Sequence, residues 1–334
     1  MINVGLIGIG GMGRMHYDCY RNNPDARLAA ICDRDPAKLA GDWSDISLNL
    51  DPDAPAEMVD LTGVETYADF DAVLANPDID LIDICLPTPL HAAMTIKALR
   101  AGKHVLCEKP MAMNAEECAQ MEAAARETGK QLMIGQCLRY WPEYVIAGQH
   151  IASGEWGRVL SADFHRSADV PGKSFEGWMA KGEQSGGAVL DMHIHDVDAA
   201  LWWFGMPDCI EADGVIFRDL PLSCDAIWRY DDGPKVTLHG SWDPNGAPFR
   251  MAFRVVMERA SIVYDTALGI FQLWRDNQAQ ELKAPDKLAY QSEIDDFIDC
   301  LISGRKLERV TPAASALAVE VTRREMAIIA EKNA

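Results

Sequence analysis

The sequence lacks paired cysteines. Its nine cysteines are scattered along 334 residues, and none of them forms a C-x-x-C motif. An odd number of isolated cysteines in a long chain argues against a disulfide framework and is typical of a reducing compartment. We therefore expect free thiols and a cytoplasmic location.

The sequence is also poor in basic residues. Lys and Arg number 31 against 51 Asp and Glu, which gives a formal net charge of −20, and no local basic patch interrupts this balance. Such a chain is repelled by phosphate backbones and by anionic lipid headgroups. We expect no nucleic-acid partner and no membrane partner.

Long apolar runs are missing as well. No stretch approaches the roughly 18 uninterrupted apolar residues that a membrane span requires. The apolar start, Met1 to Gly8, has no basic flank and is soon broken by glycine, which predicts a strand and not a signal peptide. Internal repeats, low-complexity tracts and flexible linkers are absent too.

The sequence does contain two successive parts with different hydrophobic patterns, and its length of 334 residues predicts two domains. In residues 1–135, short runs that are apolar on both faces alternate with amphipathic segments, which predicts a parallel sheet covered on both sides. The acidic segment Asp42 to Gly63 is interpreted as a loop excursion. The expected strands are Val4–Ile7, Leu28–Cys32, Leu81–Leu86, His104–Cys107 and Leu132–Gly135, and the expected helices are Gly11–Arg21, Asp69–Leu74, Leu90–Arg100 and Ala115–Thr128.

Residues 136–334 have the alternating pattern of a largely antiparallel sheet. The pattern therefore predicts an α/β domain with a parallel, doubly wound sheet, followed by an α+β domain. The expected strands are Val159–Phe164, Ile210–Phe217, Ala226–Tyr230, Val236–Ser241, Met251–Met257, Ala260–Asp265 and Ile270–Trp274, and the expected helices are Leu190–Phe204, Tyr290–Ser303 and Ala313–Glu331.

A glycine-rich turn joins the first strand to the first helix. In the segment from Gly8 to Gly13, the first glycine allows a tight turn, Gly10 lets the backbone approach a pyrophosphate, and Gly13 allows close helix–strand packing. The helix N-terminus then offers unpaired N–H groups to phosphate oxygens. Gly11 and Met12, in the same turn, are also expected to contact the dinucleotide.

Asp33 ends the second strand, about 20 residues past the last glycine, where an acid can bond the adenosine ribose hydroxyls. Its charge opposes a 2′-phosphate and so favours NAD. Arg34 can stack on adenine or accept that phosphate, so NADP stays open as an alternative.

Two further loops leave the expected sheet at its carboxyl edge. Pro87, Thr88 and His91 follow the strand that begins at Leu81, and they are expected either to contact the cofactor or to form a simple strand-to-helix turn with Thr88 as the cap. Glu108, Lys109 and Pro110 follow the next strand. Proline restricts the residue before it to extended geometry, which holds Lys109 at the crevice edge.

The second half contains an Asp and a His at helical spacing, preceded by a glycine pair. In a regular helix Asp191, His195 and Asp198 share one face, and a carboxylate one turn from an imidazole can fix its tautomer and raise its basicity. The alternative is a core-facing pair that satisfies itself. His193 lies about 200° around the helix from His195, which disfavours a zinc site of His193, His195 and Asp198; a site that also recruits His165 stays open, and we expect no metal.

These motifs, in this order, resemble the glucose–fructose oxidoreductase / inositol dehydrogenase / rhizopine catabolism (Gfo/Idh/MocA) family. The resemblance covers essentially the whole chain. It implies a Rossmann domain at 1–135 and a substrate-binding and oligomerisation domain at 136–334, with one face of the open sheet making a homodimer or homotetramer contact. The chain departs from the family at His193, where members often carry Gly, and this side chain either faces substrate or packs against a neighbouring element.

The resemblance implies an NAD(P)-dependent oxidoreductase acting on CH–OH groups of a sugar, inositol or related polyol. Lys109 matches the lysine that binds the reacting oxygen, His195 matches the proton acceptor, and Asp191 matches its partner. Tyr140 and Trp178 are added as substrate contacts because aromatic rings stack on sugars, and Arg139 is added beside Tyr140. The alternative is that these aromatic residues are simply large core side chains. The expected cofactor contacts are Gly8, Gly10, Gly11, Met12, Gly13, Asp33, Arg34, Pro87, Thr88, His91, Glu108 and Lys109.

Two other functions are compatible with the same residues. One is an NAD-dependent glycoside hydrolase that uses transient oxidation, and product analysis distinguishes it from a dehydrogenase. The other is a non-catalytic dinucleotide-binding regulator, which binds NAD without turnover.

Overall fold

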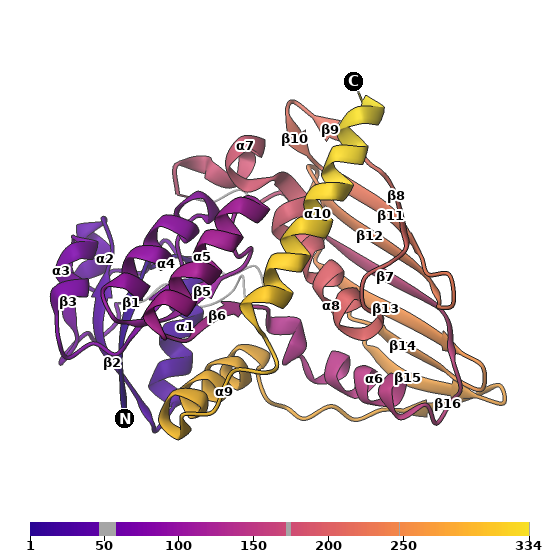
Figure 1. Cartoon of the computed structure of the whole chain (residues 1–334), viewed down its shortest axis with the longest axis horizontal. Helices are drawn as coiled ribbons and strands as arrows, with labels where there is room; N and C mark the ends of the chain where they lie inside the picture. Colours follow the sequence, from indigo (N-terminus) through magenta and orange to yellow (C-terminus); the bar gives the residue numbers. More distant parts are fainter. Residues whose placement is uncertain (47–57, 172–174, 247, 334) are drawn as a thin grey trace. The chain divides into compact units, whose positions relative to one another are not determined.

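The computed structural model describes residues 1–46, 58–171, 175–246 and 248–333. It divides into two compact units (Figure 1). Unit 1 contains Met1–Cys137 and Leu288–Ala316, and unit 2 contains Leu138–Lys287 and Leu317–Ala334. A segment near the C-terminus thus belongs to the N-terminal unit, and the functional domain division at residue 135 stays a prediction.

Unit 1 is built on a six-stranded parallel sheet with the order β3-β2-β1-β4-β5-β6. Strands β2 and β3 lie on one side of β1, and β4, β5 and β6 lie on the other. This strand order is that of a dinucleotide-binding Rossmann sheet. The predicted parallel, doubly wound class is therefore confirmed. The strands are β1 (Ile2–Ile7), β2 (Ala26–Cys32), β3 (Glu65–Tyr67), β4 (Leu81–Ile84), β5 (His104–Glu108) and β6 (Leu132–Gly135).

The helical segments of unit 1 include one 3₁₀ turn (η1), and all of them except α9 connect these strands. They are α1 (Gly11–Asn22), α2 (Pro36–Leu39), α3 (Phe70–Ala75), η1 (Thr88–Leu90), α4 (His91–Arg100), α5 (Ala115–Thr128) and α9 (Ala289–Ser303). The limits of α5 follow from its ends, because the Asn114 side chain accepts a hydrogen bond from the Glu117 N–H and Gly129 ends the helix in the left-handed region.

Sequence and structure differ in a few elements of unit 1. The strand expected over Leu81–Leu86 ends at Ile84, and the second strand ends at Cys32, so that Asp33 is the first residue after it. Strand β3 and helix α2 were not expected. Within the expected loop excursion Asp42 forms an isolated bridge with Met58, and residues 47–57 lie outside the described residues.

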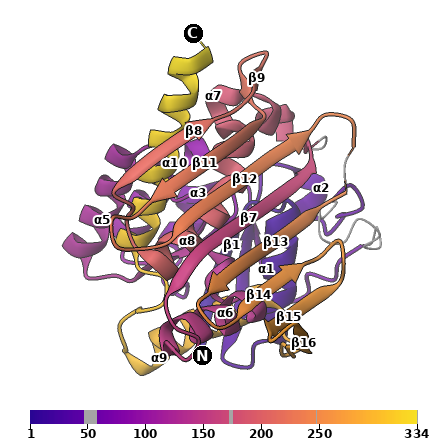
Figure 2. The same cartoon turned by 90° about the vertical axis from the view of Figure 1, so that its right-hand side faces the viewer.

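Unit 2 is built on an eight-stranded sheet with the order β16-β15-β14-β13-β7-β12-β11-β8 (Figure 2). Every neighbouring pair is antiparallel except β7 and β12, which run parallel, so the prediction of a mostly antiparallel sheet is confirmed. The strands are β7 (Val159–Asp169), β8 (Cys209–Asp213), β11 (Ser223–Arg229), β12 (Lys235–Asp243), β13 (Arg250–Met257), β14 (Ser261–Asp265), β15 (Ile270–Arg275) and β16 (Gln278–Glu281).

The strand expected over Ile210–Phe217 is split. Strand β8 ends at Asp213, and the short strand β9 (Ile216–Phe217) pairs with β10 (Leu220–Pro221) in a separate ribbon. The break falls at Gly214, where a Cβ would lie 2.1 Å from the carbonyl oxygen of Ser223. The chain therefore approaches β11 too closely there for regular pairing to continue.

The helical segments of unit 2 include α6 (Pro142–Ser153), α7 (Gly182–Ser185) and α8 (Ile194–Phe204). The helix expected over Leu190–Phe204 begins with a π-helical turn, Val189–His193, before it becomes α8. Helix α10 (Pro312–Asn333) starts in unit 1 and continues in unit 2 from Leu317. Among the described residues no helix has the length and apolar character needed to cross a membrane.

Candidate active site

The glycine-rich turn between β1 and α1 is held by close backbone contacts. Gly8 has φ +90°, and a Cβ there would lie 2.6 Å from the carbonyl oxygen of Cys85. A Cβ on Gly13 would lie 2.0 Å from the oxygen of Gly8, whereas nothing lies within 4 Å of a Cβ on Gly10. The outer glycines therefore close the turn and the middle one leaves space beside it, which is the arrangement that a pyrophosphate requires.

Asp33 is tied to this turn. Its Oδ2 accepts a hydrogen bond from the Ile9 N–H at 2.7 Å, and its Oδ1 accepts from the Asp35 N–H at 2.9 Å. Each carboxylate oxygen has a second lone pair, so both can accept a further donor such as a ribose hydroxyl. Arg34 beside it is exposed.

His91 connects the two other loops at the carboxyl edge. Its Nδ1 lies 2.7 Å from the carbonyl oxygen of Pro110, and its Nε2 lies 2.7 Å from that of Leu86. Burial lowers the pKa of this histidine, and the two carbonyl groups and Glu108 offset part of that effect. Because both ring nitrogens face backbone oxygens of the protein, His91 fixes the loop that carries Lys109.

Thr88 is buried, but it does not cap α4, whose N-cap position is Leu90. The capping role expected for Thr88 is therefore wrong, although the segment is a strand-to-helix turn; its contact with the cofactor stays a prediction. The expected helix start near His91 is confirmed.

Buried Glu108 also holds the loop that carries Lys109. Its Oε2 accepts a hydrogen bond from the Lys109 N–H at 3.0 Å, and its Oε1 lies 3.1 Å from Nε2 of His16 on α1. Burial raises the pKa of Glu108, but His16 and Lys109 outweigh this effect, and the net shift is downward. Lys109 itself is half-buried, directly after β5.

His16 belongs to a buried network that the sequence analysis missed. Its Nδ1 lies 2.8 Å from Oδ2 of Asp83, which also accepts a hydrogen bond from the Tyr20 hydroxyl at 2.9 Å. Burial lowers the pKa of His16, but Asp83 outweighs this effect and holds the pKa well above its usual value. An Asp inside the fully buried strand β4 was the available signal, since a buried carboxylate requires partners.

One edge of the unit 1 sheet therefore carries most of the expected cofactor residues. The glycine turn follows β1, Asp33 follows β2, the segment leading to His91 follows β4, and Lys109 follows β5. In an open parallel sheet this carboxyl edge is where ligands bind.

In unit 2, Asp191 lies in the π turn and His195 in the first turn of α8, and both are half-buried. Asp198 is buried and forms a bidentate ion pair with Arg139, with N–O distances of 2.9 and 2.8 Å. A π turn bonds residue i to i+5, so the spacing between Asp191 and the residues of α8 differs from that of a regular helix. His195 and Asp198 keep regular helical spacing within α8, and a face shared by all three residues stays a prediction.

The other expected substrate contacts have different surroundings. Arg139 is buried against Asp198, and Tyr140 is buried as well, whereas Trp178 is partly exposed in a 3₁₀ segment. Their roles toward substrate, like those of Lys109, Asp191 and His195, stay predictions.

His193 packs inside unit 2. Its Nε2 lies 3.0 Å from Oε2 of Glu325 on α10, and neither side chain is exposed to solvent. Of the two alternatives left open for this residue, the structure therefore shows packing against a neighbouring element.

Two clusters have the donor atoms of a metal site: His193, Cys224 and Glu325, and His16, Asp83 and Cys85. In the first cluster, Nε2 of His193 is hydrogen-bonded to Oε2 of Glu325. Nδ1 of the same ring lies beside Gly240, and Gly240 pairs with Cys224 across strands β12 and β11. One donor atom from each of the three side chains lies within 4.8 Å of the other two, and the hydrogen bond between His193 and Glu325 links two of them. His165 stacks on His239, with ring centroids 4.7 Å apart.

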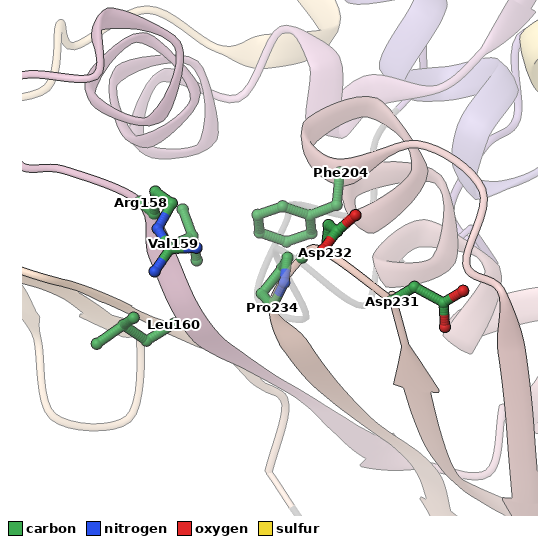
Figure 3. A pocket seen from close by; sticks show the side chains of 8 residues that line it. Arg158, Val159, Leu160, Phe204, Asp231, Asp232 and Pro234 are labelled. Carbon is green, nitrogen blue, oxygen red and sulfur yellow. The ribbon is translucent and has the colours of Figure 1, made fainter.

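A surface depression of about 460 Å³ lies at the C-terminal end of α8 (Figure 3). It is lined by Arg158, Val159, Leu160, Phe204, Asp231, Asp232, Gly233 and Pro234. None of the expected site residues contributes to it, so it is separate from the candidate catalytic residues.

The fold and these motifs define a chain of two units, the first of which is a Rossmann domain with the glycine turn of dinucleotide-binding proteins. Residues 2–136 match the model described as "Oxidoreductase family, NAD-binding Rossmann fold", and residues 144–263 match the "GFO/IDH/MocA C-terminal domain". The chain belongs to the Gfo/Idh/MocA family, which confirms the resemblance.

Curated relatives carry the names of sugar and polyol dehydrogenases. Inositol 2-dehydrogenase of Rubrobacter xylanophilus is 32% identical over 206 residues, which cover 60% of this chain and 52% of that protein. Levoglucosan dehydrogenase of Pseudarthrobacter phenanthrenivorans is 32% identical over 218 residues, 63% of this chain and 53% of that protein. The matches thus span about half the length of these relatives.

Solved structures show the same fold over nearly the whole chain. A levoglucosan dehydrogenase in complex with NADH and levoglucosan superposes with a TM-score of 0.83 at 22% identity, covering 99% of this chain and 97% of that one. At this identity the likeness establishes the architecture alone.

Proposed function

We propose that the chain is an NAD(P)-dependent oxidoreductase that transfers a hydride between a secondary alcohol of a sugar, inositol or related polyol and the nicotinamide. The observation that carries the proposal is the position of Lys109, which follows β5 at the same sheet edge as the glycine turn of an NAD-binding family domain. The names of the relatives support the substrate class.

The residues of the turn fit a dinucleotide. The space beside Gly10 admits a pyrophosphate, and Asp33 keeps acceptor capacity for a ribose. Asp33 adds a negative charge that disfavours a 2′-phosphate, so we propose NAD as the preferred cofactor. Exposed Arg34 beside it is the residue that would accommodate NADP.

The proposed chemistry divides between the cofactor and the protein. The nicotinamide, when bound, supplies the hydride acceptor or donor. His195 takes the hydroxyl proton as a general base, and Asp191 orients the imidazole or binds a neighbouring hydroxyl. Lys109 stabilises the negative charge that develops on the substrate oxygen.

We also propose a cytoplasmic homodimer or homotetramer. All nine cysteines are free thiols, which suits a reducing compartment. Light scattering of the purified protein measures the subunit number, and a monomer at micromolar concentration contradicts the oligomer.

The function is tested with a panel of sugars, inositols and polyols, read by NADH and NADPH absorbance with each cofactor. We expect reduction of NAD by at least one polyol, faster than reduction of NADP. Sugar release without net reduction, or cofactor binding without turnover on any substrate, contradicts the proposal.

A further inference from the structure

The side chain of His193 lies between Asp191 and His195 in the sequence and is bound to a distant helix. Its Nε2 is 3.0 Å from Oε2 of Glu325, which lies 132 residues later in the chain. The second oxygen of Glu325 accepts a hydrogen bond from Nε1 of Trp228 on β11 at 2.7 Å. Three buried polar side chains from three elements thus meet behind the turn that carries the candidate catalytic pair.

The sheet is shaped to admit this ring. A Cβ on Gly240 of β12 would lie 2.6 Å from Cβ of His193 and 2.8 Å from its Nδ1. The φ of Gly240 is not in the left-handed region, so the requirement for glycine here is space and not backbone conformation. Any larger residue in place of Gly240 would therefore push the π turn away from the sheet.

The electrostatics keep the pair together. Burial lowers the pKa of His193, but Glu325 and Cys224 beside it raise the pKa well above the usual value. A buried carboxylate that loses its partner is strongly unfavourable, because no water replaces the lost contact. The raised pKa favours the protonated ring, whose Nε2–H donates a hydrogen bond to Oε2 of Glu325.

The contact between His193 and Glu325 lies at the junction between the π turn and α8. The π turn Val189–His193 ends at His193, and α8 begins at the next residue. The position of His193 therefore fixes where the helix changes from π to α spacing. That change sets the relative directions of Asp191, within the π turn, and His195, in the first turn of α8.

We propose that His193 and Glu325, seated in the space left by Gly240, act as positioning residues that hold the π turn and thereby set the geometry of Asp191 and His195. This inference rests on the proposed function, in which Asp191 and His195 serve proton transfer. It assigns a role in that reaction to the C-terminal helix α10, which bears no residue of the candidate active site.

The first test compares Glu325→Ala, Glu325→Gln and the control Glu331→Ala, an exposed residue of the same helix. We expect Glu325→Ala to lower kcat about tenfold to a hundredfold, as for a small misplacement of a catalytic group. The KM for NAD should stay unchanged, because the glycine turn is in unit 1. Glu325→Gln, which keeps an acceptor oxygen for His193, should recover activity to within about tenfold of the wild type.

These variants also separate positioning from stability. kcat is expressed per folded enzyme, with the folded fraction taken from circular dichroism. If Glu325→Ala keeps the wild-type kcat per folded molecule, or if Glu325→Gln is no better than Glu325→Ala, the inference is wrong.

The second test needs no turnover. Histidine side chains labelled with ¹³C are observed by NMR in the free protein, and His195→Gln identifies the His195 signals among the eight histidines. We expect Glu325→Ala, but not Glu331→Ala, to shift the His195 ring signals. Unshifted signals overturn the inference, whereas a wild-type protein that turns over no polyol overturns only the proposed function.

Discussion

Oδ2 of Asp33 accepts a hydrogen bond from the backbone N–H of Ile9 at 2.7 Å, which ties the end of β2 to the glycine turn after β1. The carboxylate that would select the adenosine ribose thus also shapes the turn that would hold the pyrophosphate. In the proposed function, cofactor choice and turn geometry thus depend on the same side chain.

Replacing Asp33 is expected to change cofactor preference. In Asp33→Ser the negative charge that opposes a 2′-phosphate is gone, while Arg34 remains. We expect kcat/KM with NAD to fall at least about tenfold, the equivalent of roughly 1.4 kcal/mol, and the ratio of NADP to NAD activity to rise. Steady-state kinetics with both cofactors measure this change, and Asp45→Ala, at an exposed position, is the control. An unchanged NADP/NAD ratio contradicts the assignment.

Lys109→Met and His195→Ala are expected to remove chemistry and to leave cofactor binding intact. Loss of a general base or of the cation at the developing alkoxide costs about 10²- to 10⁴-fold in turnover. Calorimetry should show that NAD still binds to both variants, and His195→Ala should bind it with the wild-type affinity. Lys97→Met, at an exposed lysine of α4, is the matched control. Near-normal turnover in both purified variants rules out these roles.

The buried His16 is expected to make stability depend on pH. Its pKa is raised above the unfolded value of about 6.5, so its contribution is fully present below about pH 6.5 and is lost as pH rises through the folded pKa. The free energy of unfolding should therefore decline above pH 6.5, by at most about 1.4 kcal/mol per pH unit for this group.

Urea titrations of the wild type, His16→Gln and His150→Gln between pH 6 and 9 measure this slope. We expect His16→Gln to flatten it and His150→Gln, which changes a partly exposed histidine, to leave it unchanged. A slope that is the same in all three proteins would show that His16 does not stay protonated in the fold.

The Arg139–Asp198 pair is expected to be a stability determinant of unit 2. Asp198→Asn leaves a buried guanidinium without its counter-charge, which costs about 3–5 kcal/mol of unfolding free energy. The control is Glu211→Gln in the exposed Arg229–Glu211 pair, for which the loss of unfolding free energy should be much smaller, because solvent screens exposed charges. Equal losses in the two variants, measured by urea unfolding, would contradict the role given to burial.

Local sequence patterns predicted the backbone of this fold well. The strand ending at Ile7, the glycine turn and helix α5 follow from apolar periodicity and from the spacing of the glycines, both of which act within a few residues. The three-residue strand β3 was not predicted, because it is too short and too exposed to show a hydrophobic pattern. The π turn was not predicted either, because the spacing of four residues between Asp191 and His195 was interpreted as that of a regular helix.

The pairing of buried charges could not be predicted in the same way. His193 meets Glu325, and Arg139 meets Asp198, only after distant segments pack together. A buried charge in an apolar segment signals that a partner exists, as Asp83 in β4 shows, but it does not say which residue that partner is. For the same reason the sequence could name Lys109, Asp191 and His195 as candidates but could not identify the groups that hold them.

The parallel pairing of β7 with β12 has a consequence for biosynthesis. Strand β7 leaves the ribosome well before β12 and β13, the two strands that flank it, and α8, β8 and β11 are made in between. At the usual elongation rate of about 5–20 residues per second, both edges of this long strand stay without their final neighbours for several seconds. The nascent chain must be protected from edge-to-edge association during that interval, so the centre of the sheet is completed late although its first strand is made early.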